Sequence, residues 1–349
     1  MRQRPEQGRR RWKVSYGVHP DDPPADPARR PRTESTTGRT RPEAPALQAR
    51  TERDMLRRAL SQNLLRQVGA DHFLSLVTDD KVSLAIEVGA GEGILTERLA
   101  ARYERVLAYE VDPHMAQRLS ARVGRLRNVR VDVADFLAAT PPEEPFQVVG
   151  NVPFSITSAI VAWCLQAQRM TSATIIAQAE YVKKRTGAYG RWSLLTILTW
   201  PEFDWQMLGQ IPRSQFRPVP RVDAGVLRLA RREVSLVPAP KLAAYHRMVE
   251  LGFSGLGGTL FASLGRAYPG RWVADAFRAA RLDRATVVAF VSPQQWIDVF
   301  AALEPRIRSG GLAGEPVASA RPGRPGRRPG GKAGRSAPRP GRGGPRPST

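Results

Sequence analysis

Apolar runs alternate with longer amphipathic stretches in the first part of the chain's middle region. Strands are predicted where apolar and β-branched residues cluster, at residues 83–88, 106–110, 129–135 and 146–150. Helical spacing of the apolar residues predicts helices at residues 93–103, 113–123 and 155–168. A series in which strands alternate with helices is typical of a mostly parallel sheet covered by helices.

The pattern changes in the second part of the middle region. Further strands are predicted at residues 173–181, 203–209 and 225–229. The last two flank the proline-marked stretch FRPVPRVD, which indicates an antiparallel addition to the sheet. From residue 240 onward the apolar spacing is helical, at residues 241–251, 258–264, 271–280 and 293–303. We therefore expect an α/β domain at residues 51–235 and a small all-helical domain at residues 236–308.

Both ends of the chain lack an apolar pattern and are strongly basic. Residues 1–50 hold 12 Arg or Lys against 6 Asp or Glu, and residues 306–349 hold 11 against 1, within a total charge of +22. Such segments cannot bury enough apolar surface to offset the entropy of ordering. We predict a disordered N-terminal arm at residues 1–50 and a disordered Gly/Pro/Arg-rich tail at residues 309–349. Their charge indicates an anionic partner, with nucleic acid first and an anionic membrane surface second.

The scarcity of cysteine and histidine excludes several classes of protein. Cys164 is the single cysteine, so no disulfide framework is possible, and four scattered histidines lack metal-ligand spacing. The basic N-terminus is not followed by an apolar segment, and no apolar run approaches the roughly 20 residues that span a bilayer. We expect a cytoplasmic protein with no metal and no membrane partner.

A glycine-rich loop follows the first predicted strand and opens a helix. Its sequence EVGAGEG places Gly89 and Gly91 where an open α/β sheet binds nucleotides, although a structural turn would also use glycine. The dinucleotide pattern G-x-G-x-x-G fails here, because Ile94 stands where the last glycine would fall. A diphosphate ligand is therefore disfavoured.

Acidic residues end the next two predicted strands. Glu110 lies 21 positions after Gly89, where a carboxylate accepts hydrogen bonds from ribose hydroxyls. Asp135 is placed to accept from an adenine amino group, and the Phe136 N–H to donate to a ring nitrogen. Either acid alone could be a turn residue, but their alignment with the loop favours a pocket. Ribose and adenine without a diphosphate indicate S-adenosylmethionine.

The stretch NVPF at residues 151–154 ends the fourth predicted strand without any ionisable side chain. The Asn151 side-chain oxygen and a backbone carbonyl near Pro153 are two acceptors, which suit the NH₂ group of adenine N6. Phe154 would stack on that base. The nucleophile then belongs to the substrate, and the protein needs none. A turn with a core-facing phenylalanine is the alternative.

These motifs together resemble the rRNA adenine N6-methyltransferases, and most closely the Erm family, which methylates 23S rRNA and confers macrolide, lincosamide and streptogramin B resistance. The similarity extends to four further stretches, which are SQNLL at residues 61–65, YGR at 189–191, FRPVPRV at 216–222 and PQQW at 293–296. It covers about residues 55–305 and neither arm. The family usually has Phe at the position of Leu64 and often Tyr at the position of Phe154.

The resemblance implies a Rossmann-like S-adenosylmethionine-dependent methyltransferase sheet followed by a helical RNA-binding domain. Together with the strand-end analysis, it predicts cofactor contacts from Gln62, Asn63, Leu65, Gly89, Gly91, Glu110, Asp135, Phe136 and Asn151. Asn151, Pro153 and Phe154 are expected to hold the target adenine, and Lys183, Lys184, Arg185 and Arg191 to contact RNA phosphates.

The implied substrate is one adenine in the peptidyl-transferase region of 23S rRNA, where dimethylation blocks the drugs. The protein is expected to act as a monomer. Two alternatives stay open at this point, a 16S rRNA dimethyladenosine transferase and a non-catalytic RNA-binding factor with the same fold.

Deletion of residues 309–349 is expected to weaken RNA binding and to flatten its dependence on salt, because fewer phosphates are neutralised. Titration of RNA at several salt concentrations measures both quantities. An unchanged salt slope would show that the tail serves solubility alone.

Overall fold

The computed structural model describes residues 63–78 and 80–309, which belong to one compact unit. The predicted arm at residues 1–50, the tail beyond residue 309 and Gln62 lie outside the described residues.

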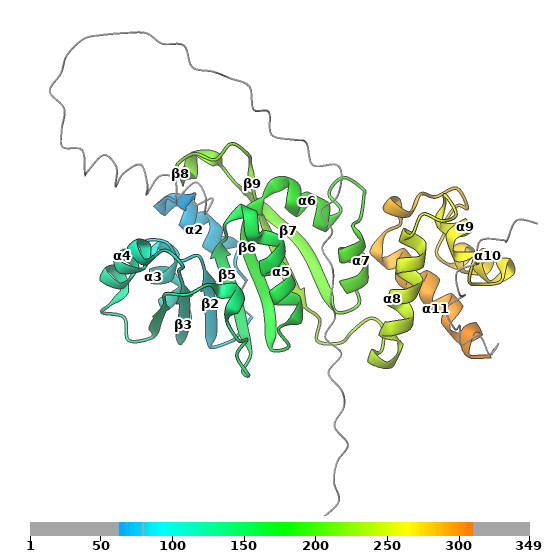
Figure 1. The fold of residues 1–349 in the computed structure, drawn as a ribbon, viewed down its shortest axis with the longest axis horizontal. Helices are drawn as coiled ribbons and strands as arrows, with labels where there is room; N and C mark the ends of the chain where they lie inside the picture. Colours follow the sequence, from blue (N-terminus) through cyan, green and yellow to red (C-terminus); the bar gives the residue numbers. More distant parts are fainter. Residues whose placement is uncertain (1–62, 79, 310–349) are drawn as a thin grey trace, which may run out of the picture. The chain divides into compact units, whose positions relative to one another are not determined.

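The core of the fold is a seven-stranded sheet with the order β4-β3-β2-β5-β6-β9-β7 (Figure 1). Five neighbouring strands are parallel, and β9 is antiparallel to both β6 and β7. The strands are β2 Leu84–Val88, β3 Arg105–Tyr109, β4 Val129–Asp132, β5 Phe146–Asn151, β6 Met170–Gln178, β7 Phe203–Ile211 and β9 Ala224–Arg231. The predicted Rossmann-like sheet and its antiparallel addition are confirmed.

The strand order reverses at β2, with β3 and β4 on one side of it and β5 and β6 on the other. In open parallel sheets the crevice for a ligand lies at the carboxyl ends of the strands beside such a reversal. The glycine loop follows β2, and Asn151 is the last residue of β5. The topology thus brings together two motifs about 60 residues apart in the sequence.

Successive side chains of each central strand point to opposite faces of the sheet and pack into different core clusters. Ala85 packs against α2 Gln67–Leu76 and α3 Ile94–Ala100, whereas Ile86 belongs to the cluster that includes α5 Thr157–Gln166. The strands are therefore apolar on both faces, as parallel sheets require. Cys164 of α5 is fully buried in this second cluster.

Helix α4, Pro113–Val123, has the predicted bounds because its ends are strongly specified. The Asp112 side chain accepts hydrogen bonds from the N–H groups of His114 (2.8 Å) and Met115 (3.4 Å). Pro113 occupies the first helical position, where its missing N–H costs no hydrogen bond.

Two predicted strand ends are wrong. The strand predicted at residues 173–181 stops at Gln178, because the Ala179 N–H donates to the Asp223 carbonyl and the chain turns into α6, Ala179–Thr186. The strand predicted at residues 129–135 stops at Asp132. Asp135 instead caps the short 3-10 helix Phe136–Ala138, accepting from the Leu137 N–H at 2.9 Å.

Besides α6, two helices and a small sheet were not predicted. They are α2, the short α7 Leu194–Thr199, and a two-stranded sheet in which β1 Leu64–Leu65 pairs with β8 Phe216–Arg217. Strands of two residues carry no periodic signal. Their pairing depends on contacts between segments about 150 residues apart.

The helical region contains α8 Ala239–Phe253, α9 Leu260–Leu264, α10 Gly270–Ala279 and α11 Pro293–Ser309, which gather beside α7 in Figure 1. Ile197 of α7 packs into their core, and the Tyr245 hydroxyl donates to the Ile197 carbonyl at 2.9 Å. The two predicted domains therefore share α7.

Candidate cofactor and substrate site

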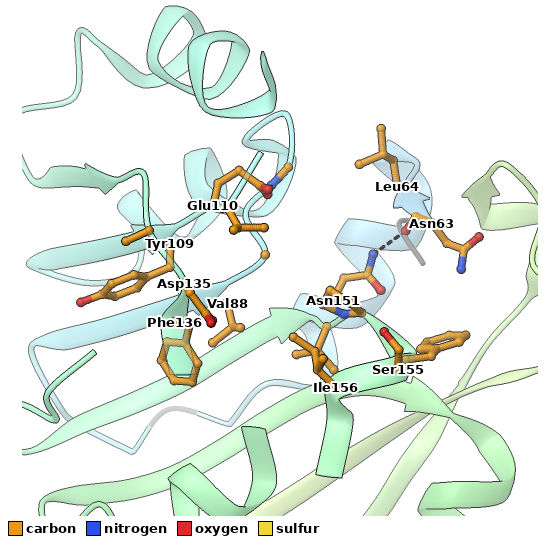
Figure 2. A pocket seen from close by; sticks show the side chains of 17 residues that line it. Asn63, Leu64, Val88, Tyr109, Glu110, Asp135, Phe136, Asn151, Ser155 and Ile156 are labelled. Carbon is orange, nitrogen blue, oxygen red and sulfur yellow. Dashed lines mark hydrogen bonds between the residues drawn. The ribbon is translucent and has the colours of Figure 1, made fainter. Parts of the chain in front are cut away.

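One pocket opens at the carboxyl ends of β2, β3 and β5 and encloses about 890 Å³, its open mouth included. This volume is in the range of small-molecule sites. Figure 2 shows Tyr109, Glu110, Asp135 and Phe136 on one side and Asn63, Leu64, Asn151 and Ser155 on the other. The lining is completed by Val88, Gly89, Gly91, Val111, Ala134, Val152, Pro153, Phe154 and Ile156.

The glycine loop leaves room for a ligand because it carries no side chains at two points. Gly89 has a φ of 71°, and a Cβ added there would lie 3.5 Å from the Pro153 ring. A Cβ added at Gly91, with a φ of 57°, would lie 3.0 Å from Leu64. Side chains at either position would narrow the space between the loop and the opposite wall. The loop thus fits a ligand that approaches the backbone closely.

Glu110 is nearly fully buried and held by backbone N–H groups. Its Oε2 accepts from Gly91 at 2.8 Å, and its Oε1 accepts from Asp112 at 2.9 Å. Burial raises the pKa of this carboxyl, and the two N–H donors oppose that rise. Each carboxylate oxygen can accept a second hydrogen bond. A diol such as ribose is a suitable donor for these lone pairs.

Asp135 and Phe136 form the other end of the same wall. Phe136 is buried between Tyr109, at 5.6 Å between ring centroids, and Trp163, at 4.4 Å. Its N–H lies in the first turn of a 3-10 helix, where backbone donors have no partner within the helix. A carboxylate, an N–H group and apolar surface together suit the edge and face of an adenine ring.

Asn151 lies on the opposite side of the pocket from Glu110 and Asp135. Its Nδ2 donates to the Asn63 carbonyl at 2.6 Å (Figure 2). A carbonyl can only accept, so this bond fixes which amide atom is which and directs Oδ1 away from Asn63. Asn151 therefore offers an oriented acceptor in the pocket.

The backbone carbonyl predicted near Pro153 could be that of Val152 or that of Pro153 itself. The Pro153 carbonyl is already engaged. It accepts from the Ile156 N–H at 3.1 Å and closes the 3-10 turn Phe154–Ile156. The Val152 carbonyl, immediately before the proline ring, is the better second acceptor. Phe154 lines the pocket and packs partly against the core.

Most predicted cofactor and substrate residues are brought together here, with two exceptions. The Leu65 side chain is buried in the core cluster beside α2, so its neighbour Leu64 lines the pocket instead. Gln62 lies outside the described residues. Sequence reasoning missed the apolar lining residues, such as Tyr109 and Val111, which flank Glu110. Their position next to a predicted site residue was the one available signal.

The predicted RNA-binding residues lie apart from the pocket, on α6 and the segment that follows it. Lys184 and Arg191 are exposed. Arg185 is engaged internally, since its Nη1 donates to Ser193 Oγ at 3.0 Å and its guanidinium lies 5.1 Å from the Tyr181 ring. It is thus the least suited of the four to bind a phosphate.

Residues 63–78 and 80–309 contain neither a membrane-spanning helix nor a metal-binding cluster. No helix there combines the length and apolar character needed to cross a membrane. Nor does this part of the chain hold three His, Cys, Asp or Glu side chains arranged to bind a metal ion.

Glu87 lies on β2 beneath the glycine loop, with 1% of its surface exposed. Neither carboxyl oxygen has a hydrogen-bond partner among the described residues. Burial raises the pKa of Glu87 to about 8, and the nearby charge of Glu110 contributes to the rise. Thr96 acts in the opposite direction but does not reach hydrogen-bonding geometry. Glu87 therefore keeps its proton at neutral pH.

Substitution Glu87→Gln is expected to change how stability depends on pH. Below pH 4.5 both states of the wild type are protonated, whereas between 4.5 and about 8 only the unfolded state ionises. The free energy of unfolding of the wild type should fall over this interval relative to the variant, by about a few kcal/mol. Urea unfolding from pH 5 to 9 measures the difference, with the exposed Glu97→Gln as control. A difference independent of pH would contradict the burial of a neutral acid.

Comparison with known proteins places these features in a family. The profile of the ribosomal RNA adenine dimethylase family matches residues 60–304. An rRNA adenine N-6-methyltransferase of Streptomyces fradiae is 53% identical over 252 residues, which cover 71% of this chain and 79% of that protein. The mycinamicin-resistance protein MyrB of Micromonospora griseorubida is 31% identical over 70% of this chain and 78% of its own.

A solved structure of the same kind of enzyme is also similar to this chain. The crystal structure of the 23S rRNA methyltransferase ErmE has a TM-score of 0.66 and 44% identity, and the match covers 69% of this chain and all of that one. The family match spans the sheet, the pocket and the helical region. The chain belongs to the ribosomal RNA adenine dimethylase family.

Proposed function

We propose that this protein transfers methyl groups from S-adenosylmethionine to N6 of one adenine in 23S rRNA. The observation that carries the proposal is the oriented Asn151 oxygen, which faces the pocket at the end of β5. The 44% identity to a 23S rRNA methyltransferase over that protein's whole length supports the choice of RNA.

The pocket offers a distinct partner for each part of the cofactor. Glu110 would accept from the ribose hydroxyls, while Asp135 and the Phe136 N–H would bind the adenine edge. The loop at Gly89 and Gly91 would lie against the methionine portion. When bound, S-adenosylmethionine supplies a methyl group already activated by its positive sulfur.

The protein's main task is to prepare a weak nucleophile. The lone pair of adenine N6 is delocalised into the ring, so hydrogen bonds that favour tetrahedral nitrogen favour the transition state. Asn151 Oδ1 and the Val152 carbonyl would accept the two N6 protons. Such preorganised hydrogen bonds contribute about 3 kcal/mol each in well-studied enzymes. Attack on the methyl group leaves N6 positively charged and strongly acidic, so it then releases a proton without a dedicated base.

Phe154 would hold the base in place. An adenine inside a helix cannot reach this pocket, so the target must leave its stack. Stacking on an aromatic ring contributes about 1 to 3 kcal/mol of binding free energy per base, which offsets part of the cost of unstacking. The phenylalanine keeps this contact, while the hydroxyl that a tyrosine would supply is absent.

Methylation of 23S rRNA would make this a resistance enzyme against macrolides and related drugs. A relative named for mycinamicin resistance supports this reading. The 16S rRNA dimethyladenosine transferase is the rival, because it would use the same pocket on another RNA. Primer extension on both rRNAs from cells expressing the protein separates them. A single strong stop in 23S rRNA is expected, and a stop confined to 16S rRNA would refute the proposed substrate.

Substitution Asn151→Ala is expected to lower methyl transfer roughly 100- to 1,000-fold, since it removes an oriented acceptor. Affinity for S-adenosylmethionine should stay within a few-fold of the wild type, because the groups that bind ribose and adenine remain. Single-turnover methylation and calorimetry measure the two quantities. Undiminished turnover would exclude Asn151 as the amine acceptor.

Substitution Phe154→Leu is expected to weaken productive RNA binding by roughly 5- to 100-fold, because a leucine cannot stack on a base. Phe154→Tyr is the matched control and should retain activity. Both are compared by kcat/KM for a 23S rRNA transcript. Equal losses in the two variants would indicate a packing role instead of stacking.

A further inference from the structure

Two aromatic rings are unusually exposed outside the pocket. Tyr189 is 52% exposed and Phe290 is 50% exposed. Among the exposed large apolar side chains in the described part of the chain, these two alone are aromatic. A single exposed apolar side chain is common, so the significance of these two rings depends on the groups that surround them.

The two rings come from different domains that meet at this place. Tyr189 lies between α6 and α7, whereas Phe290 lies between α10 and α11. The Trp192 N–H donates to the Ala289 carbonyl at 2.8 Å, which ties the two segments together. The Arg191 guanidinium lies 5.3 Å from the centre of the Phe290 ring.

Each ring carries a cation on one face. Lys183 Nζ lies 5.4 Å from the centre of the Tyr189 ring. The Tyr189 hydroxyl donates to the Glu180 carboxylate, at 2.7 and 2.9 Å from its two oxygens, which fixes the ring. Fixed aromatic rings with adjacent Lys or Arg are the combination by which proteins bind unpaired nucleic acid. Lys183 is also paired with Glu180 at 3.5 Å, so the exposed Arg191 is the cation better placed to bind a phosphate. The remaining ring surface suits bases.

This surface lies within reach of the target adenine. Helix α6 begins directly after Gln178, at the carboxyl end of β6, and β6 pairs with β5 so that Ile176 lies opposite Asn151. Eight helical residues extend about 12 Å. Nucleotides close to the target in the same strand can therefore reach Tyr189.

We propose that Tyr189 and Phe290, with Lys183 and Arg191, form a stacking surface for unpaired nucleotides that flank the target adenine. The proposal rests on the proposed function and adds to it a recognition element shared by both domains. It assigns the helical region a direct contact with bases through Phe290.

The test compares aromatic and charge substitutions by their effect on RNA affinity and its salt dependence. Phe290→Leu and Tyr189→Leu should each weaken binding of a 23S rRNA transcript roughly 5- to 100-fold and leave the salt slope unchanged, since no charge is lost. Arg191→Gln should weaken binding and also flatten the slope. Tyr189→Phe loses the bond to Glu180 but keeps the ring, and should bind like the wild type.

Further controls separate this surface from general destabilisation. Val234→Ala changes a side chain that is 80% exposed elsewhere and should have no effect. Phe290→Trp should retain binding and show RNA-dependent quenching beyond that of the seven native tryptophans. Thermal unfolding and affinity for S-adenosylmethionine should be unchanged in all variants.

The outcomes distinguish this inference from the proposed function. Wild-type affinity in both leucine variants, with normal methylation of 23S rRNA, would overturn the stacking surface alone. Methylation of 16S rRNA only would overturn the proposed substrate, and the affinity series would then be measured on 16S rRNA. Loss of affinity there would still support stacking, and equal affinity would refute it.

Discussion

The hydrogen bond from Asn151 Nδ2 to the Asn63 carbonyl connects the chemistry of the site with its construction. It orients the amide so that its oxygen is available to a substrate amine. It also holds the segment before β1 against the end of β5. That segment is anchored from its other side by the pairing of Leu64 with Arg217 and by the Arg66 N–H, which donates to the Gln215 carbonyl at 2.7 Å. The side of the pocket that carries Asn63, Leu64 and Asn151 depends on this arrangement.

The parts of the fold that follow from local pattern were predictable. The central parallel strands are mostly apolar runs, and α4 and the helices after residue 240 have helical periodicity. Glu110, Asp135 and Asn151 all lie close to strand ends. The sheet topology brings these residues together, because the parallel strands beside β2 have their carboxyl ends at the same edge of the sheet. This is why three separated motifs could be assigned to one pocket from the sequence.

What could not be predicted depends on long-range contacts. The β1–β8 pair has two residues in each strand, and the packing of α7 into the helical core follows from contacts with residues about 50 positions away. The sequence could place the second acceptor only near Pro153, because the 3-10 turn that engages the Pro153 carbonyl has no sequence signature. Leu65 was assigned by resemblance, and the structure places its side chain in the core while Leu64 lines the pocket.

The join between the two domains has a consequence for how such enzymes diverge. The bond between the Trp192 N–H and the Ala289 carbonyl uses backbone atoms alone, so it places no demand on the neighbouring side chains. Residues 189, 191 and 290 can therefore change without loss of this backbone bond, whereas a change at 191 or 290 removes the contact between Arg191 and the Phe290 ring. A backbone bond of this kind holds the segments before α7 and α11 together independently of the side chains at these positions.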